Sequence, residues 1–100
     1  QKKKITIKKI PKDVEPNYHS FYITSQKRSS LLIDYLYKNR VQSYIGYVPL
    51  HNSIYGKKLK LNKRLPNTEK IHNKLIRLPS HPNLLQKDVN KITDLLLQYF

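Results

Sequence analysis

The sequence predicts a small domain that combines helices with β-strands. The length of 100 residues lies within the usual range for one domain. Short runs of β-branched and aromatic residues indicate strands, and apolar residues at helical spacing indicate helices between and after them. From the first core strand onward, the expected order of elements is β-α-β-α-β-α. This spacing permits either parallel or antiparallel pairing of the two strands around the first helix.

The N-terminal part is expected to be mostly extended. Isoleucines in a lysine-rich background suit a short edge strand, because lysines deter aberrant pairing there; they are Ile5, Ile7 and Ile10. Pro11 and Pro16 keep the chain extended, so residues 1–17 form a lead-in to the domain. Residues 18–25, with their aromatic and β-branched side chains, are the first core strand.

A helix and a second strand are expected next. Apolar residues repeat at helical spacing over residues 30–38, a hydroxyl of Ser29 or Ser30 suits the N-cap, and Asn39 suits a left-handed end. Residues 41–48 alternate in polarity and therefore predict a second strand, which a proline ends.

The C-terminal half is expected to pass through a loop before its last elements. Residues 52–64 are polar and basic, which is typical of a loop. Asn67 suits the N-cap of a short helix, and residues 75–78 form a third strand. The apolar spacing from Gln86 onward predicts an amphipathic C-terminal helix.

Positive charge is the strongest feature of the composition. Lysine and arginine number 20 against 6 acidic residues, a formal net charge of +14. Such a charge favours binding to a polyanion, but lysines spread along the chain far outnumber arginines, whose fork suits specific recognition of phosphates and bases. We therefore interpret the charge as a solvated surface and expect no specific nucleic-acid partner. The alternative is a free-standing basic module that binds nucleic acid or another polyanion.

Composition also excludes several kinds of site. Without cysteine there is no disulfide framework or thiolate metal site, which suits a cytoplasmic location. No apolar run approaches the roughly 18 residues that span a bilayer, so no membrane insertion is expected. The histidines show no metal-ligand spacing, and the scattered carboxylates predict no acid/base pair. We predict no metal.

Five segments carry a resemblance to a known family. They are His19-Ser20-Phe21-Tyr22-Ile23, Leu31-Leu32-Ile33-Asp34-Tyr35-Leu36, Tyr47-Val48-Pro49-Leu50-His51, Thr68-Glu69-Lys70 and Leu78-Pro79-Ser80-His81-Pro82-Asn83-Leu84. In this order and spacing, they resemble the C-terminal portion of the DegT/StrS sugar aminotransferase family. Within that family, Lys27-Arg28-Ser29-Ser30-Leu31-Leu32-Ile33 and Pro49-Leu50-His51 are most similar to transaminases of dTDP-4-keto-6-deoxy sugars for lipopolysaccharide or enterobacterial common antigen.

The resemblance implies an α+β fold in which helices pack on a small, mainly antiparallel sheet. Residues 1–100 would be the C-terminal small domain of a fold type I enzyme that depends on pyridoxal phosphate. The whole enzyme would transfer an amino group from glutamate to a keto sugar nucleotide and work as a homodimer. Its Schiff-base lysine and most phosphate contacts would lie in a large N-terminal domain. We therefore assign no catalytic or cofactor-binding residue here and expect this chain alone to be inactive.

Two residues are candidates for substrate binding. By the resemblance, His51 faces the cleft between the large and small domains, where imidazole can hydrogen-bond the sugar or its phosphates. The alternative is that His51 anchors a turn. Tyr55 would contact the same ligand or pack over a loop. At Gly46 the family often has a histidine, so one polar contact is either missing or supplied elsewhere, and His81 is expected to fix the connection before the last helix. An apolar set near this turn is expected to face another domain: Tyr44, Tyr47, Leu50, Ile54 and Tyr55.

Overall fold

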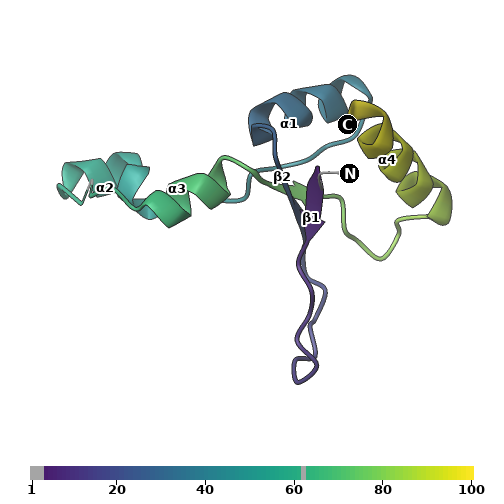
Figure 1. The fold of residues 1–100 in the computed structure, drawn as a ribbon, viewed down its shortest axis with the longest axis horizontal. Helices are drawn as coiled ribbons and strands as arrows, with labels where there is room; N and C mark the ends of the chain where they lie inside the picture. The colour runs from purple at the N-terminus through teal and green to yellow at the C-terminus, as the bar shows by residue number, and fades with distance from the viewer. Residues whose placement is uncertain (1–3, 62) are drawn as a thin grey trace.

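Three short strands form an antiparallel sheet in the order β1-β2-β3, as Figure 1 shows. The strands are β1 (Ile5–Ile7), β2 (Phe21–Ser25) and β3 (Leu75–Leu78). In this computed structural model, which describes residues 4–61 and 63–100, Ile23 of β2 lies opposite both Ile7 and Ile76. The α+β class and the antiparallel sheet are therefore confirmed, and β1 lies at the sheet edge as expected.

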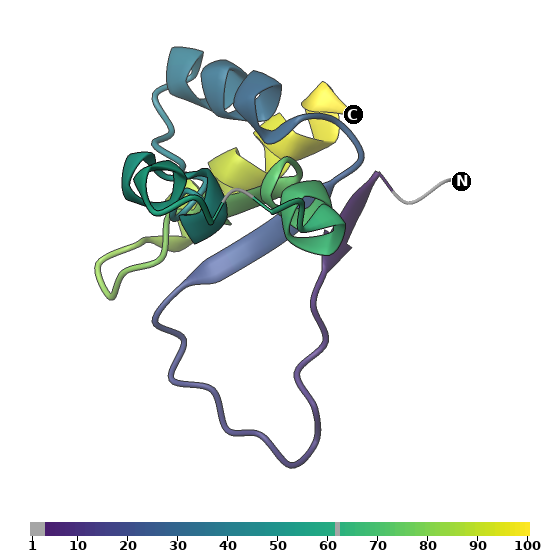
Figure 2. The ribbon, with the colours of Figure 1, turned by 90° about the vertical axis from the view of Figure 1, so that its left-hand side faces the viewer.

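Two helices cover one face of this sheet. They are α1 (Ser29–Lys38) and α4 (Gln86–Tyr99), which lie side by side in Figures 1 and 2. Alternate strand residues point to the same face, so the cross-strand partners Ile23 and Ile76 both reach the core. The buried core consists of Ile23, Leu32, Leu36, Val41, Ile76, Leu78, Ile92 and Leu95. Beside it, the rings of Tyr35 and Tyr99 pack with their centroids 4.8 Å apart.

The ends of β2 and α1 differ from the sequence prediction. Tyr18 has a φ of 53°, which breaks the extended conformation before β2 begins. The N-cap of α1 is Arg28, without a side-chain cap, so the predicted serine cap is wrong. At the other end, Arg40 takes the left-handed conformation (φ 63°) instead of Asn39, whose side-chain amide donates to Tyr35 O at 2.8 Å.

The predicted strand over residues 41–48 is wrong. Within the described structure, this segment joins the sheet only through an isolated antiparallel bridge between Tyr44 and Arg77. The side chains of this segment still alternate in burial. Val41 and Ser43 are buried against the domain, and their neighbours are exposed. Gly46 then takes a φ of 85°, which turns the chain and prevents a strand from continuing.

Short helices replace the first part of the predicted loop over residues 52–64, whose Asn62 lies outside the described residues. A 3-10 turn, η1 (Leu50–Asn52), is followed by α2 (Ile54–Lys58). Neither is long enough to produce a readable periodicity in sequence. Next comes α3 (Pro66–His72), which has Leu65 as its N-cap and Pro66 as its first residue, so the predicted Asn67 cap is wrong. The third strand and the start of the C-terminal helix at Gln86 are as predicted.

Two parts of the chain extend away from the sheet. In Figure 1, α2 and α3 project to one side, and the loop over residues 8–20 projects from the end of β1. We call η1, α2 and α3 the projecting arm. The radius of gyration is 15.5 Å, compared with about 13 Å for a compact domain of this length. Among the described residues, no helix is both long enough and apolar enough to cross a bilayer.

Candidate functional site

His51 lies in the middle of the turn that follows Pro49 and is only 7% exposed. The hydroxyl of Ser53 fixes this turn from both sides. Its Oγ accepts from the Gly56 N–H at 2.9 Å, which caps α2, and donates to Leu50 O at 2.7 Å. The histidine is therefore part of a turn whose backbone is hydrogen-bonded, and it is not a freely exposed side chain.

Gly56 allows α2 to pack closely against η1. A Cβ atom built at this position would lie 2.0 Å from Leu50 O, a distance that no real Cβ contact tolerates. The glycine is accordingly buried. Gly56 must lack a side chain because of this close approach. Glycine is needed at position 46 for a different reason, the positive φ of the backbone there.

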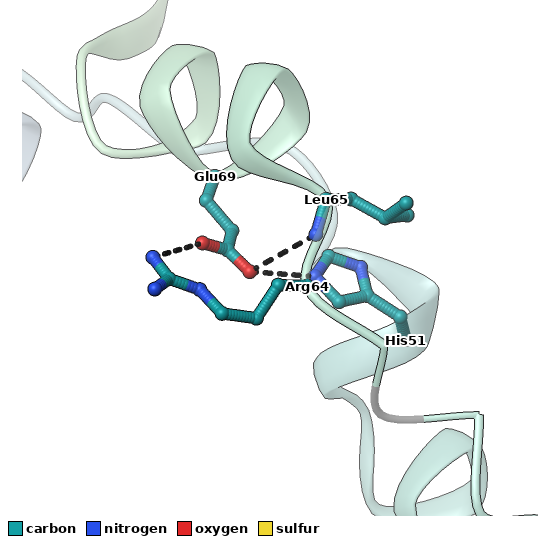
Figure 3. A network of polar contacts seen from close by, with 4 residues as sticks. All are labelled: His51, Arg64, Leu65 and Glu69. Carbon is teal, nitrogen blue, oxygen red and sulfur yellow. Dashed lines mark hydrogen bonds and ion pairs between the residues drawn. The ribbon is translucent and has the colours of Figure 1, made fainter.

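Glu69 of α3 holds His51 from across the arm, as Figure 3 shows. Its Oε1 lies 3.3 Å from His51 Nε2 and also accepts from the Leu65 backbone N–H at 3.3 Å. Its Oε2 lies 3.7 Å from a terminal guanidinium nitrogen of Arg64. One carboxylate therefore joins η1, the start of α3 and the chain between them, although Glu69 is 18 residues from His51 in sequence.

The same contacts set the charge of Glu69. The hydrogen bond from His51 lowers the pKa of the carboxyl group, and the Leu65 N–H and the nearby Arg64 act in the same direction against the effect of burial. An ionised carboxylate only accepts hydrogen bonds, so His51 Nε2 must carry the proton that it donates. In the neutral ring, Nδ1 is then the acceptor, and Figure 3 places that nitrogen on the side away from Glu69.

Tyr55 lies next to this turn but faces outward. It is 66% exposed on α2, whereas His51 is buried, and among the described residues no hydrogen bond joins their side chains. A groove of about 510 Å³ runs beside the turn, between the segment over residues 45–50 and α3. Its walls include Tyr47, Leu50 and His72. The structure thus brings the two predicted site residues to one arm, where they have different environments.

Arg77 occupies the space next to Gly46. A Cβ atom at Gly46 would lie 3.3 Å from Arg77 Nε, and the Arg77 guanidinium lies 5.7 Å from the centroid of the Tyr47 ring. Sequence reasoning missed Arg77, because nothing in a strand sequence shows which segment a side chain will meet. Glu69 lies in the first turn of α3, where a negative charge is favourable.

The described residues of this chain do not fit the covalent attachment of pyridoxal phosphate. A lysine that forms a Schiff base must be desolvated or lie beside another cation to lose its proton. Every described lysine is exposed except Lys74, which is half-buried. In the described part of the chain, no three His, Cys, Asp or Glu side chains gather to hold a metal ion.

Large apolar side chains are exposed around the His51 turn. Those predicted to face another domain are Tyr44 at 55%, Tyr47 at 84%, Leu50 at 83%, Ile54 at 92% and Tyr55 at 66% exposed. All five are exposed, as a contact with another domain would require, and that contact stays a prediction. Exposed apolar surface is typical of an interaction site when it is contiguous.

Comparison with protein families gives one assignment. Residues 1–97 match the DegT/DnrJ/EryC1/StrS aminotransferase family. The chain belongs to this family. Family membership confirms the resemblance found in the sequence. Enzymes of this family depend on pyridoxal phosphate. No curated protein matches this member of the family.

Solved structures of this family show the same fold as this chain. An aminotransferase of the DegT/DnrJ/EryC1/StrS family from Brucella abortus superposes with a TM-score of 0.80 at 24% identity, over 96% of this chain and 26% of its own. PseC from Helicobacter pylori, an aminotransferase involved in the biosynthesis of pseudoaminic acid, gives 0.74 at 23% identity, over 82% of this chain and 23% of its own. The sugar aminotransferase CalS13 from Micromonospora echinospora gives 0.80 at 11% identity, over 98% and 26%.

This chain corresponds to only part of each of these solved structures. It spans about a quarter of the length of these aminotransferases and matches their C-terminal part. The remaining three quarters of those chains have no counterpart here.

Proposed function

We propose that residues 1–100 are the C-terminal small domain of an enzyme dependent on pyridoxal phosphate that transfers an amino group from glutamate to a keto sugar nucleotide. Residues 1–17 lead in from a large N-terminal domain, which holds the cofactor. The product serves the synthesis of lipopolysaccharide or another cell-surface polysaccharide. The whole enzyme is a cytoplasmic homodimer.

The observation that carries this proposal is the match of residues 1–97 to the family over only about a quarter of the length of its solved members. The physical properties of the chain support it. The projecting arm exposes large apolar side chains, and the molecule is more extended than a compact domain of the same length. Such a surface suits packing against the rest of an enzyme.

The proposal assigns this chain a role on the substrate side of the cleft. His51 and Tyr55 contact the sugar nucleotide when the large domain packs beside the turn. Glu69 keeps the Nε2 proton of His51 engaged, so the neutral ring offers Nδ1 as an acceptor to a hydroxyl or ammonium group. The cofactor, when bound by the large domain, supplies the electron sink for amino transfer.

Reduction with borohydride tests whether the lysine that binds the cofactor lies in the large domain and not in this chain. We expect the purified chain, mixed with pyridoxal phosphate and glutamate, to show no stoichiometric labelling of a single lysine and no amino transfer. The polypeptide encoded by the complete reading frame should show both. Site-specific labelling of this chain with turnover would contradict the proposal.

Substitution in the complete enzyme tests the two site residues. His51→Ala should reduce use of the sugar nucleotide by the equivalent of about 0.5–1.5 kcal/mol, while cofactor retention stays unchanged, because one hydrogen bond to the neutral imidazole is lost. Tyr55→Phe should raise the KM for the sugar nucleotide, whereas Tyr37→Phe, an equally exposed tyrosine on α1, should not. Unchanged kinetics with a lower melting temperature for His51→Ala would show that this residue only anchors the turn.

A further inference from the structure

A second cavity opens where β3 ends, away from the His51 turn. It has a volume of about 540 Å³ and lies between the start of β2, the end of α1 and one side of α4. Apolar side chains contribute to its wall: Val41, Leu78, Leu84 and Ile92. This volume is within the range of about 300–1,000 Å³ that is usual for small-molecule sites. Neither His51 nor Tyr55 lines it.

Basic residues from five separate segments line this cavity. They are His19 before β2, Arg40 after α1, Arg77 in β3, His81 between β3 and α4, and Lys91 in α4. The one acidic residue in the lining is Asp88, whose Oδ2 already accepts from the Leu85 backbone N–H at 3.1 Å. Within the described parts of the chain, no ion pair neutralises any of these five residues.

The backbone of Arg40 gives a separate reason to assign it a role. Its φ of 63° lies in the left-handed region, where glycine is the usual residue after a helix and a Cβ atom adds strain. An arginine in this conformation keeps a cation at the cavity at a conformational cost that glycine would avoid. Such an outlier is a recognised sign of a functional position.

Arg77 is held firmly at the other side of the cavity. Its backbone is bonded to Tyr44 in both directions, with N···O distances of 3.1 and 2.6 Å. Its guanidinium lies against Gly46 and the Tyr47 ring, which are outside the cavity, so Arg77 shapes the wall and is not assigned as a ligand.

We propose that this cavity binds a small molecule that carries a phosphate or diphosphate group. The guanidinium group of Arg40 binds the phosphate oxygens, for which the planar arginine fork is well suited, and Lys91 of α4 adds a second cation at the wall. The apolar wall holds the uncharged remainder of the ligand. This site is independent of the proposed aminotransferase function, because it uses neither His51 nor Tyr55.

Pyrophosphate is the probe that tests the site. We expect saturable binding of pyrophosphate to the purified protein by isothermal titration at fixed ionic strength, with weaker binding of inorganic phosphate. Arg40→Gly should weaken this binding by about tenfold, since a charge-assisted hydrogen bond is lost. The same substitution relieves the positive φ, so its melting temperature should stay equal or rise. Misfolding would lower the melting temperature. Weaker binding without a lower melting temperature would therefore come from the loss of the Arg40 side chain.

Lys57→Gln is the matched control, because it removes one positive charge from exposed α2 in the projecting arm. It should leave the affinity for pyrophosphate unchanged. The proposal is wrong if pyrophosphate does not saturate, if Lys57→Gln weakens binding as much as Arg40→Gly, or if Arg40→Gly binds as well as the original protein. Equal affinity for succinate would assign the cavity to carboxylates instead. The borohydride experiment tests the proposed aminotransferase function separately, so the two proposals can fail independently.

Discussion

His51 acquires a partner in the structure that its sequence motif does not show. The motif places it after a proline, and the fold places Glu69 against its Nε2 atom. Because the same carboxylate also accepts from Leu65 and lies near Arg64, the turn and the start of α3 are joined at one point. A substitution at Glu69 should therefore affect the turn without touching any residue in it.

The lowered pKa of Glu69 predicts a pH dependence of stability. A group whose pKa is lower in the folded state than its ordinary value of 4.5 stabilises the fold fully above that value, and this stabilisation is lost as the pH falls through the lowered pKa. The melting temperature of the original protein should therefore exceed that of Glu69→Gln at neutral pH, and the difference should shrink under acidic conditions.

Thermal unfolding followed by circular dichroism across this pH range measures the effect. Asp34→Asn, which alters an exposed carboxylate on α1, is the control and should leave the profile of the original protein unchanged. A difference between the original protein and Glu69→Gln that stays constant on acidification would contradict a role for the ionised Glu69 carboxylate.

Among the elements, η1 and α2 depend most on a single close approach. They are short, and hydrogen bonding within one or two turns gives little stability by itself. Their arrangement rests on the Ser53 cap and on the missing side chain at Gly56. The close steric fit of Gly56 against Leu50 therefore determines whether η1 and α2 form or the segment is an irregular loop.

Gly56→Ala should destabilise the chain. The added methyl group would lie 2.0 Å from Leu50 O, so η1 and α2 would have to move apart, at a cost of about 1–3 kcal/mol typical of overpacking. Chemical denaturation measures the free energy of unfolding. Lys57→Ala, at the next and exposed position of α2, should change it little. If the two variants have the same stability, the close approach of Gly56 to Leu50 is not required.

At the scale of the whole molecule, the net charge of +14 bears on the alternative function. The basic residues line more than one surface, including the cavity at the end of β3 and the projecting arm. Distributed charge attracts any polyanion through release of counterions, and such binding has no sequence preference.

Nucleic acid should therefore bind weakly and be lost steeply as the salt concentration rises. Competition between one labelled oligonucleotide and a large excess of random DNA, near physiological salt, measures this. Specific DNA-binding proteins prefer their site by about 4–10 kcal/mol. Retention of one preferred oligonucleotide by a margin of that size would favour the basic binding module over the aminotransferase domain.

The sequence by itself determined the family and those local elements whose pattern was strong. A β-branched run predicted β2, helical apolar spacing predicted α1 and α4, and ordered motifs identified the aminotransferase resemblance. These features depend on neighbouring residues or on a pattern along the chain, so they can be read without the fold.

Only the tertiary structure decided the rest. Residues 41–48 alternate like a strand, but Gly46 turns them away after one bridge to Arg77, and residues 50–58 form helical turns because Gly56 fits against Leu50. The partners of His51 and the cavity at Arg40 likewise come from segments far apart in the chain. Contacts of this kind depend on packing in space, which local propensity and periodicity do not encode.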